Sequence, residues 1–578
     1  MNDFVNRRAF LRQTSMVGLG VSTLGVGYGA IPITETNERL ISSKNEESLH
    51  WNVLDAHCVL GRHLKLRGGG LHTTQDLLSE MDHYGISEAL VLDSLSKENF
   101  PWDGNQRILQ LTEKQPRLHR AWSIVPSWTE ETKQTSTQFY DSMVEHDVEA
   151  VFLFPNQYLF NLSDWCIDEI IAPLAHHKVP IFINPTEANG RGGSDSTDWD
   201  GVVALCKRWP NLPVIISEGR IRRSQRLLYK AFDACPNLHL ELSAYWLHRG
   251  IEYITEKWGA DRMVFGSGWP KFGQHMTLVN LTTAQISDAD KKLVAGDNLR
   301  NLLSWNKPFE KQNITLPPPE DEYVAYGRSG KRPADMKFYD IHGHLGEYNA
   351  HYHVPNAQIA DVIKDVDYYG IEKVCVFSFA GVYSDEKFGN DIVVDAVEKY
   401  PKPLIGFTLL NPLRGENEMI AELERGDKNG MRGIKLIPTY QGYPVEGSLI
   451  EIACQWAHDH RQIIINHYWG SADQVEKLVS KYPNACFVTA HTTIEYADVM
   501  KRHPNLYVCS VPLLTPRKCE EVVEAIGADR FLFGTDLLDL PIGWGLGPIL
   551  FARISAADKT LILKDNLKNI LTNYSLLK

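Results

Sequence analysis

The second half of the chain alternates short apolar runs with longer stretches of helical periodicity. Eight apolar runs follow one another there: KFYDIH, KVCVFSF, LIGFTLL, RGIKLI, QIIINH, CFVTAH, LYVCSV and FLFGTD. Most are apolar throughout, as expected for parallel strands that are covered on both faces. Segments such as NAQIADVIKDVDYYG lie between the runs and have the spacing of amphipathic helices. Eight such units in about 240 residues predict a (β/α)8 barrel, with a doubly wound open sheet as the structural alternative.

The first half repeats this pattern. VLDAHCVLG, from Val53, matches FYDIHGHLG, from Phe338, and ADRMVFGSG, from Ala260, matches ADRFLFGTD, from Ala528. Further matches, such as VEAVFLFP against MRGIKLIP, keep the same order, and the offset between partners drifts only from 285 to 268 residues. A tandem duplication of one domain explains this order. The predicted fold class is therefore α/β, with two tandem TIM-like (β/α)8 barrels.

The sequence divides into five expected segments. We expect an export signal in residues 1–30, a flexible N-terminal segment in 31–50, a degenerate barrel in 51–306 and a catalytic barrel in 337–578. Residues 307–336 contain three consecutive prolines, many charges and little periodicity, which predicts a linker.

The first 30 residues have the pattern of a twin-arginine signal. Arg7 and Arg8 precede Phe10 and a weakly apolar, glycine-rich run that ends near Ala30. The run has about 15 residues, fewer than the roughly 20 strongly apolar ones that span a bilayer, although an uncleaved anchor is the alternative. We therefore expect periplasmic or similar export by the twin-arginine route, and no stable membrane span after cleavage.

Composition excludes several other functions. The 578 residues are 43% hydrophobic and 23% charged, which is typical of a globular protein with more than one domain. A net charge of −13 without a long basic tract argues against nucleic acid as a partner. The nine cysteines are scattered and form no CxxC motif, so neither a disulfide framework nor a zinc ribbon is expected.

Ionisable residues end several of the predicted strands in the second half. His342 and His344 lie two apart on the first strand, so both side chains can point into the barrel. His467, His491 and Asp536 end the fifth, sixth and eighth strands, whose carboxyl ends share one mouth. Three imidazoles (His342, His344 and His467) and the Asp536 carboxylate suit one divalent ion, with Zn²⁺ the first choice, and leave room for a water. Asp536 would then act as the base, and His491 would orient or protonate the substrate.

These motifs, in this order, resemble the amidohydrolase superfamily, and the layout resembles its amidohydrolase-related branch. That branch includes aminocarboxymuconate-semialdehyde decarboxylase, resorcylate-type decarboxylases and pyrone-dicarboxylate lactonase. The resemblance covers the second half nearly end to end and the first half more loosely. It implies His342, His344, His467 and Asp536 as metal ligands and His491 as a catalytic or supporting residue. The lactonase type keeps a metal-free barrel open as an alternative.

Other residues near the predicted mouth have less certain roles. Lys435, on the fourth strand, could bind a substrate carboxylate, carry a carboxylate that bridges two metal ions, or form a structural ion pair. Tyr440, Tyr443 and Trp469 follow the fourth and fifth strands closely enough to line a substrate pocket, although aromatic residues there are as often packing. Asp340 is expected to support the histidines by hydrogen bonding.

The first half has lost this constellation. The counterparts of the four expected ligands are His57, Val59, Pro185 and Gly268. Valine, proline and glycine side chains cannot coordinate a cation, so we expect this barrel to have lost its metal. It could persist as a scaffold, a docking partner or a binding lobe, and Asp55, His57 and Glu218 could still form a polar pocket.

The sequence therefore predicts an exported, metal-dependent hydrolase that acts on a small-molecule ester, lactone or amide. A non-oxidative decarboxylase of an aromatic or unsaturated acid would use the same ion and is the first alternative. A non-catalytic periplasmic binding or scaffold protein is the second. Related barrels often dimerise, so a homodimer is expected by analogy.

Overall fold

The structure is a computed structural model that describes residues 51–66, 68–126, 131, 133–186, 197–219, 221–347 and 349–576. The expected export signal and the segment after it, residues 1–50, lie outside the described residues. What is described belongs to one compact unit, Leu49–Lys578. Within it, no helix combines the length and the apolar character that crossing a membrane requires.

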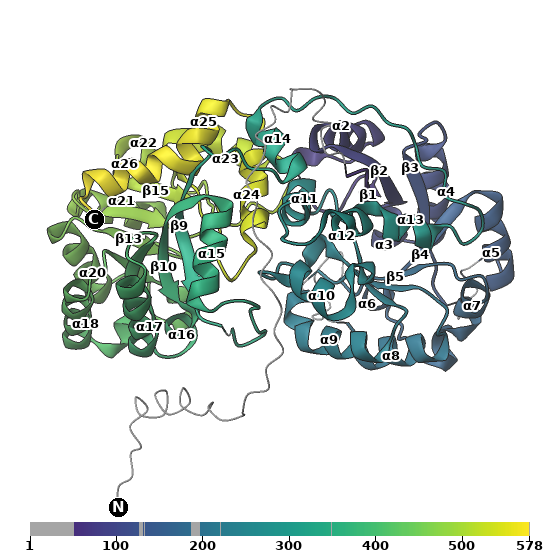
Figure 1. The fold of residues 1–578 in the computed structure, drawn as a ribbon, viewed down its shortest axis with the longest axis horizontal. Coiled ribbons are helices and arrows are strands. Elements are labelled where there is room, and N and C mark those ends of the chain that lie inside the picture. The colour runs from purple at the N-terminus through teal and green to yellow at the C-terminus, as the bar shows by residue number, and fades with distance from the viewer. Residues whose placement is uncertain are drawn as a thin grey trace, which may run out of the picture. The chain divides into compact units, whose positions relative to one another are not determined.

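Two parallel sheets of eight strands each form the core of the unit (Figure 1). In each sheet the strands pair in sequence order, from β1 to β8 and from β9 to β16. The strands of the first sheet are β1 (Val53–Leu60), β2 (Ile86–Asp93), β3 (Leu118–Ser123), β4 (Val148–Leu153), β5 (Ile181–Ile183), β6 (Val214–Ile216), β7 (Leu238–Glu241) and β8 (Met263–Val264). Those of the second are β9 (Phe338–Leu345), β10 (Ile371–Ser378), β11 (Leu404–Leu409), β12 (Gly433–Leu436), β13 (Ile463–Asn466), β14 (Cys486–Thr489), β15 (Leu506–Cys509) and β16 (Phe531–Leu532).

Both sheets close on themselves. In the first, the amide of Ala56 donates to the carbonyl of Phe265, just after β8, at 2.9 Å. In the second, the amide of Ile341 donates to the carbonyl of Phe533 at 3.0 Å. The two tandem (β/α)8 barrels are thus confirmed, and the open sheet is excluded.

Helices connect the strands on the outside of each barrel (Figure 1). The first barrel has α2 (Thr74–Tyr84), α3 (Leu95–Glu98), α4 (Pro101–Thr112), α5 (Ser136–Glu145), α6 (Pro155–Tyr158), α7 (Asp164–His176), α8 (Trp199–Arg208), α9 (Gln225–Ala234), α10 (Gly250–Trp258), α11 (Gln274–Thr282), α12 (Asp288–Lys292) and α13 (Asn298–Leu303). The second has α15 (Ile359–Tyr369), α16 (Phe379–Tyr383), α17 (Glu386–Lys399), α18 (Glu416–Lys428), α19 (Pro438–Gln441), α20 (Ser448–Asp459), α21 (Ala472–Lys481), α22 (Ala497–Arg502), α23 (Lys518–Ile526), α24 (Ile542–Leu550), α25 (Ala556–Thr560) and α26 (Asn566–Asn573).

The duplication extends to irregular features. A single π-helical turn, η5 (Leu293–Asp297), precedes α13 in the first barrel, and its counterpart η8 (Leu561–Asp565) precedes α26 in the second. Each stands where the last helix returns to its barrel, directly before the matching DNLRNLL and DNLKNIL segments. Because π-helical turns are rare, their shared position supports a common origin of the two copies.

The connecting stretch 307–336 contains a helix that its composition did not predict. This helix, α14 (Glu322–Ser329), begins after Asp321, whose side chain accepts from the amide of Val324, and ends at Gly330, which has a φ of 73°. These are ordinary capping signals. Tyr323 and Tyr326 are buried, so this part of the connection packs against the barrels and is more than a tether.

The two barrels pack together through α11 and α24. Glycines let the helices approach closely: a Cβ added to Gly543 would lie 2.4 Å from Thr283 Oγ1, and one added to Gly547 would lie 2.4 Å from the carbonyl oxygen of His275. Such distances are below contact distance, so only glycine fits at these two positions.

A buried ion cluster also joins the barrels. Asp365, on α15 of the second barrel, has a side chain only 1% exposed. It accepts hydrogen bonds from His248 Nε2 at 3.1 Å, from the guanidinium of Arg249 and from Gln285 Nε2 at 3.1 Å, all in the first barrel.

Candidate metal centre

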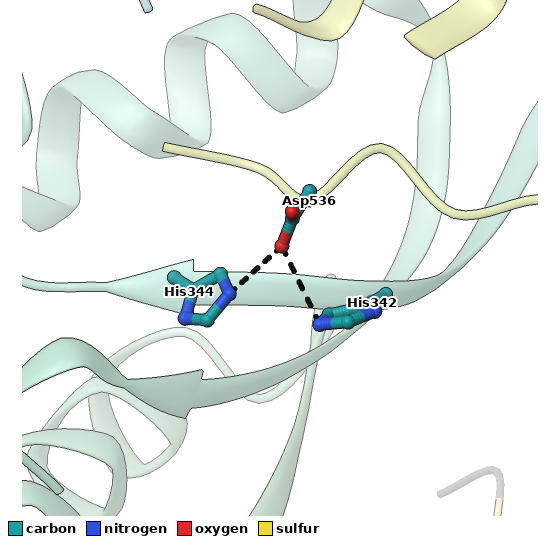
Figure 2. A group of neighbouring side chains, drawn as sticks. All are labelled: His342, His344 and Asp536. Carbon is teal, nitrogen blue, oxygen red and sulfur yellow. Dashed lines mark hydrogen bonds and ion pairs between the residues drawn. The ribbon is translucent and has the colours of Figure 1, made fainter. Parts of the chain in front are cut away.

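Strand β9 presents two imidazoles to the interior of the second barrel. Alternate residues of a strand share a face, and Figure 2 shows His342 and His344 side by side along β9. His342 is fully buried and His344 is 6% exposed. His342 Nδ1 lies 3.0 Å from the carbonyl oxygen of Ala490, a bond that requires the proton on Nδ1. This tautomer leaves the lone pair of His342 Nε2 directed into the barrel.

Asp536 reaches the same point from the end of β16. Its φ is 58°, in the left-handed region, which aspartate tolerates better than most residues. Asp340 supports this turn: its carboxylate accepts from the amide of Thr535 at 3.1 Å and from the amide of His342 at 2.9 Å. Asp340 therefore ties β9 to the turn that carries Asp536, in the supporting role expected for it.

His342, His344 and Asp536 together could hold a metal ion. One donor atom from each lies within 4.8 Å of the others. Asp536 Oδ1 is 2.8 Å from His344 Nε2 and 3.4 Å from His342 Nε2, the two contacts drawn in Figure 2. Three buried groups that converge in this way have the composition of a divalent-metal site with imidazole and carboxylate ligands.

The surroundings of this triad favour a neutral His342 imidazole and an ionised Asp536 carboxylate. Burial, followed by the nearby Lys435 ammonium, pushes the pKa of His342 well below its usual value. Burial alone would raise the pKa of Asp536, but His342 and His344 outweigh it and hold that pKa far below the usual range. Unprotonated imidazoles and an ionised carboxylate are the forms that bind metal.

The other two histidines lie beside the triad. His467 and His491 end β13 and β14, and their Nε2 atoms are 3.3 Å apart. The ring of His467 is 6.1 Å from that of His342 between centroids, so His467 stands next to the three-residue cluster but outside it. Burial lowers the pKa of both His467 and His491. Both rings line the cavity above the triad, which has a volume of about 620 Å³.

Lys435 lies deep in the barrel. It is fully buried, and its Nζ is 3.4 Å from His342 Nε2 and 4.1 Å from the ring centroid of Phe377. Burial lowers the pKa of its ammonium to about 7. Lys435 is therefore next to the metal ligands, at a depth that suits contact with an ion or with the inner end of a substrate.

The expected aromatic residues separate into two groups. Tyr440 is 56% exposed, lines the cavity, and its ring centroid is 5.5 Å from that of His467. Trp469 is 1% exposed and donates its indole N–H to the carbonyl of Val488 at 3.0 Å. Tyr443 is also buried, and its hydroxyl accepts from the amide of Ile437 at 2.6 Å. Tyr440 thus faces the cavity, whereas Trp469 and Tyr443 pack in the protein.

The first barrel adds two side chains that sequence analysis missed. Arg222 and Trp246 line the cavity of the second barrel together with the metal-site residues. Arg222 Nη1 donates to Asp539 Oδ2 at 3.0 Å and to the carbonyl oxygen of Asp539 at 2.6 Å. Asp539 also accepts from the hydroxyl of Tyr352. In the sequence, only Asp539, three residues after Asp536, hints at Arg222, because a carboxylate removed from water needs a cationic partner.

The matching site of the first barrel is built differently. Gly268 has a φ of 69°, so it keeps the backbone turn of its counterpart Asp536 but provides no carboxylate. His57 Nδ1 turns to Glu241 Oε2 at 3.3 Å, and the ring of Phe152, which replaces Lys435, packs 5.3 Å from the ring of His57. Among the described residues of the first barrel, no cluster of donor atoms corresponds to the one in the second.

The polar pocket expected from Asp55, His57 and Glu218 does not form as a group. Asp55 is buried and accepts from the amide and hydroxyl of Ser267, whereas Glu218 accepts from Thr197. Only His57 of the three lines the cavity at this mouth.

Comparison with known proteins points to one family. The amidohydrolase family model matches residues 340–566, within the second barrel. No curated protein matches the chain.

The solved structures similar to part of the chain include three decarboxylases. A 2,6-dihydroxybenzoate decarboxylase from Rhizobium is 14% identical and covers 41% of this chain and 99% of its own, with a TM-score of 0.33. A dihydroxybenzoic acid decarboxylase from Polaromonas sp., with bound manganese, is 16% identical over 42% of this chain and 98% of its own (TM-score 0.33). A 5-carboxyvanillate decarboxylase from Sphingomonas paucimobilis is 11% identical over 44% and 99% (TM-score 0.35). Identities and TM-scores this low carry no argument about the reaction of this chain.

Proposed function

We propose, from the premise that residues 340–566 belong to the amidohydrolase family, that the second barrel is a metal-dependent hydrolase of a small-molecule ester, lactone or amide. The observation that carries the proposal is the convergence of His342, His344 and Asp536 within 4.8 Å, beside a cavity that His344 and Asp536 line. Nothing comparable faces the mouth of the first barrel among the described residues. The second barrel is the enzyme domain, and the ion expected there is Zn²⁺.

A divalent ion at this site supplies Lewis-acid chemistry: it polarises a carbonyl group and lowers the pKa of a water molecule. His342 and His344 would hold it through Nε2, with the Asp536 carboxylate as third ligand; His467, which lies next to this cluster, is the fourth ligand expected from the sequence. The Asp536 carboxylate lines the cavity and would be the group placed to take a proton from a water held at this site.

His491 and Arg222 act on the substrate. The His491 imidazole lines the cavity beside His467; it could take up the proton released by the attacking water and pass it to the leaving group. Arg222 places a cation above Asp536 and fixes one polar end of the substrate, while Tyr440 provides an apolar face.

Metal analysis tests the proposal. Purified protein should contain one divalent ion per chain, and His344→Ala or Asp536→Asn should lose most of it. The matched control is His57→Ala in the first barrel, which should leave the ion content unchanged. A wild type without bound ion, and with no change in melting temperature on chelation, would contradict the proposal and favour a non-catalytic binding protein.

One observation favours a second function, the decarboxylation of an aromatic or unsaturated acid. Arg222, with its guanidinium in the cavity, is suited to a substrate that carries a carboxylate. Product analysis separates the two reactions, because a decarboxylase releases CO₂ and a hydrolase releases an acid without CO₂.

We also propose that the protein is exported by the twin-arginine route to the periplasm or an equivalent compartment. The support is the Arg7–Arg8 pair ahead of a glycine-rich apolar run. A reporter fused to residues 1–50 should be exported, and the double substitution Arg7→Lys, Arg8→Lys should block it. Export that continues in the double variant would contradict this route.

A further inference from the structure

Two cysteines of the first barrel lie side by side under its outer helices. Cys206 is on α8 and Cys235 directly follows α9, and each side chain is only 1% exposed. Their thiols are within hydrogen-bonding reach of each other. A disulfide needs Cβ atoms about 4 Å apart, a separation that two thiols in contact can reach. The pair is therefore a candidate for a covalent link.

The backbone around the pair is held by one asparagine. Asn237, two residues after Cys235, reaches back with its side-chain amide to α8 and the turn that follows it. Its Nδ2 donates to three carbonyl oxygens there, those of Cys206 at 3.4 Å, Trp209 at 3.0 Å and Leu212 at 2.8 Å. These bonds tie the helix that carries Cys206 to the turn that carries Cys235. The backbone, and not only the side-chain rotamers, keeps the two cysteines together.

The second barrel has the same backbone arrangement without the cysteines. Asn505 Nδ2 donates to the carbonyl oxygen of Val479 at 3.2 Å, at the corresponding place in that barrel. By the offsets of the repeat, Val479 stands at the position of Cys206, and His503 at that of Cys235. The shared fold therefore requires neither thiol. Two cysteines that meet in one copy, where the other copy has valine and histidine, indicate a property of the first barrel alone.

Cys235 is the thiol better placed to react first. It stands in a surface turn, where both of its chain neighbours are exposed, and its carbonyl oxygen accepts from Arg262 Nη2 at 2.7 Å. Burial raises the pKa of its thiol, but the Cys206 thiol, Lys207 and Arg262 act in the opposite direction. For Cys206, the contact with Cys235 adds to burial and raises the pKa further. Since the thiolate is the nucleophile in disulfide chemistry, attack by Cys235 is the easier first step.

We propose that Cys206 and Cys235 form a disulfide when the folded chain meets a disulfide oxidant. The Cys235 thiolate attacks one sulfur of the oxidant, and the other sulfur leaves as a thiolate. The Cys206 thiolate then attacks Cys235 Sγ and displaces the oxidant sulfur that is bound there. The two cysteines lose two protons and two electrons, and the disulfide of the oxidant is reduced to two thiols.

The bond would join α8 to the turn before β7, on the outer wall of the first barrel. Neither cysteine lines the cavity at the mouth of either barrel, so the proposal does not depend on the reaction of the second barrel. The proposed export would bring the pair into a compartment in which disulfides persist, whereas the cytoplasm keeps such thiols reduced. The bond is therefore expected in the exported form of the chain.

Thiol counting on the full-length protein tests the proposal. The reduced protein is incubated with glutathione disulfide and then denatured in N-ethylmaleimide, so that mass spectrometry counts the free thiols. The wild type should lose two of its nine thiols, with a peptide map that links Cys206 to Cys235. Cys206→Val, which introduces the residue of the second barrel, should lose none. The matched control is Cys166→Ala, at another buried cysteine of the first barrel, which should still lose two.

Three results of this experiment would overturn the proposal. They are nine free thiols in the oxidised wild type, glutathione adducts without an internal link, and a link between other cysteines. The melting temperature of the wild type adds a measurement that needs no variant to fold. Oxidised protein should melt at a higher temperature than reduced protein, because the bond restricts the unfolded chain. An oxidised wild type that melts no higher would also overturn the proposal, since the bond would then distort the fold.

Discussion

Removal of the Asp365 carboxylate should separate the stabilities of the two barrels. In Asp365→Ala, the buried His248 and the cation of Arg249 both lose the Asp365 carboxylate. Among the described residues, Arg249 still pairs with Glu252. Breaking one side of a buried ion pair costs about 3–5 kcal/mol, because the remaining charge is left without a partner. With a side chain 1% exposed, Asp365 belongs at the upper part of that range.

Urea unfolding monitored by fluorescence measures this cost. A two-domain chain need not unfold in one step, so we expect the variant to show an earlier, separate transition rather than one shifted curve. The matched control is Asp361→Ala on the same helix, where Asp361 is 39% exposed and pairs with Lys364. An exposed pair contributes less than about 1 kcal/mol. A loss below 1 kcal/mol for Asp365→Ala, or equal losses for both variants, would refute the reasoning.

The pH adds a second test of the same contact. Burial would raise the pKa of Asp365, but His248 and Arg249 outweigh it, so the pKa in the folded protein is below the ordinary value. A lowered pKa stabilises the fold above the unfolded-state pKa of about 4 and loses that effect as the pH falls below it. The difference between wild type and Asp365→Ala should therefore be full at pH 7 and shrink on acidification.

Two further predictions concern stability. Burial would lower the pKa of His119, but Glu149 and Glu88 raise it to about 9, so the fold should lose up to about 3 kcal/mol as the pH rises from about 6.5 to 9. Thermal melts across that range should show the loss in the wild type and not in His119→Gln; a flat profile in both would contradict it. Gly543→Val should cost about 1–3 kcal/mol or more, because its new Cβ would overlap Thr283 where α11 meets α24. A melting temperature equal to that of the wild type would show that the helices move apart freely.

Much of the fold could be predicted because apolar runs and strand ends are local features. The eight runs of the second half became β9–β16, and the two-residue spacing of His342 and His344 put both on one face. Trp469 also follows a strand closely, but nothing in the local sequence shows whether the chain turns its ring inward. It lies in the core, with its indole bonded to Val488.

Other features depend on contacts between distant parts of the chain. Arg222 enters the cavity of the second barrel only because the two barrels pack together, which a repeat alone does not determine. The helix at 322–329 was signalled by Asp321 and Gly330, but the prolines before it favoured a linker.

Helix α24 shows why neither copy can be discarded. Every one of its residues, from Ile542 to Leu550, is buried, and α11 of the first barrel covers one side of it. A fragment cut at the connection would expose this apolar helix to water and lose the guanidinium of Arg222 from its cavity. The first barrel is therefore part of the structure around the second site: it covers α24 and contributes a side chain to the wall of the cavity, so a deletion of either barrel would damage what remains.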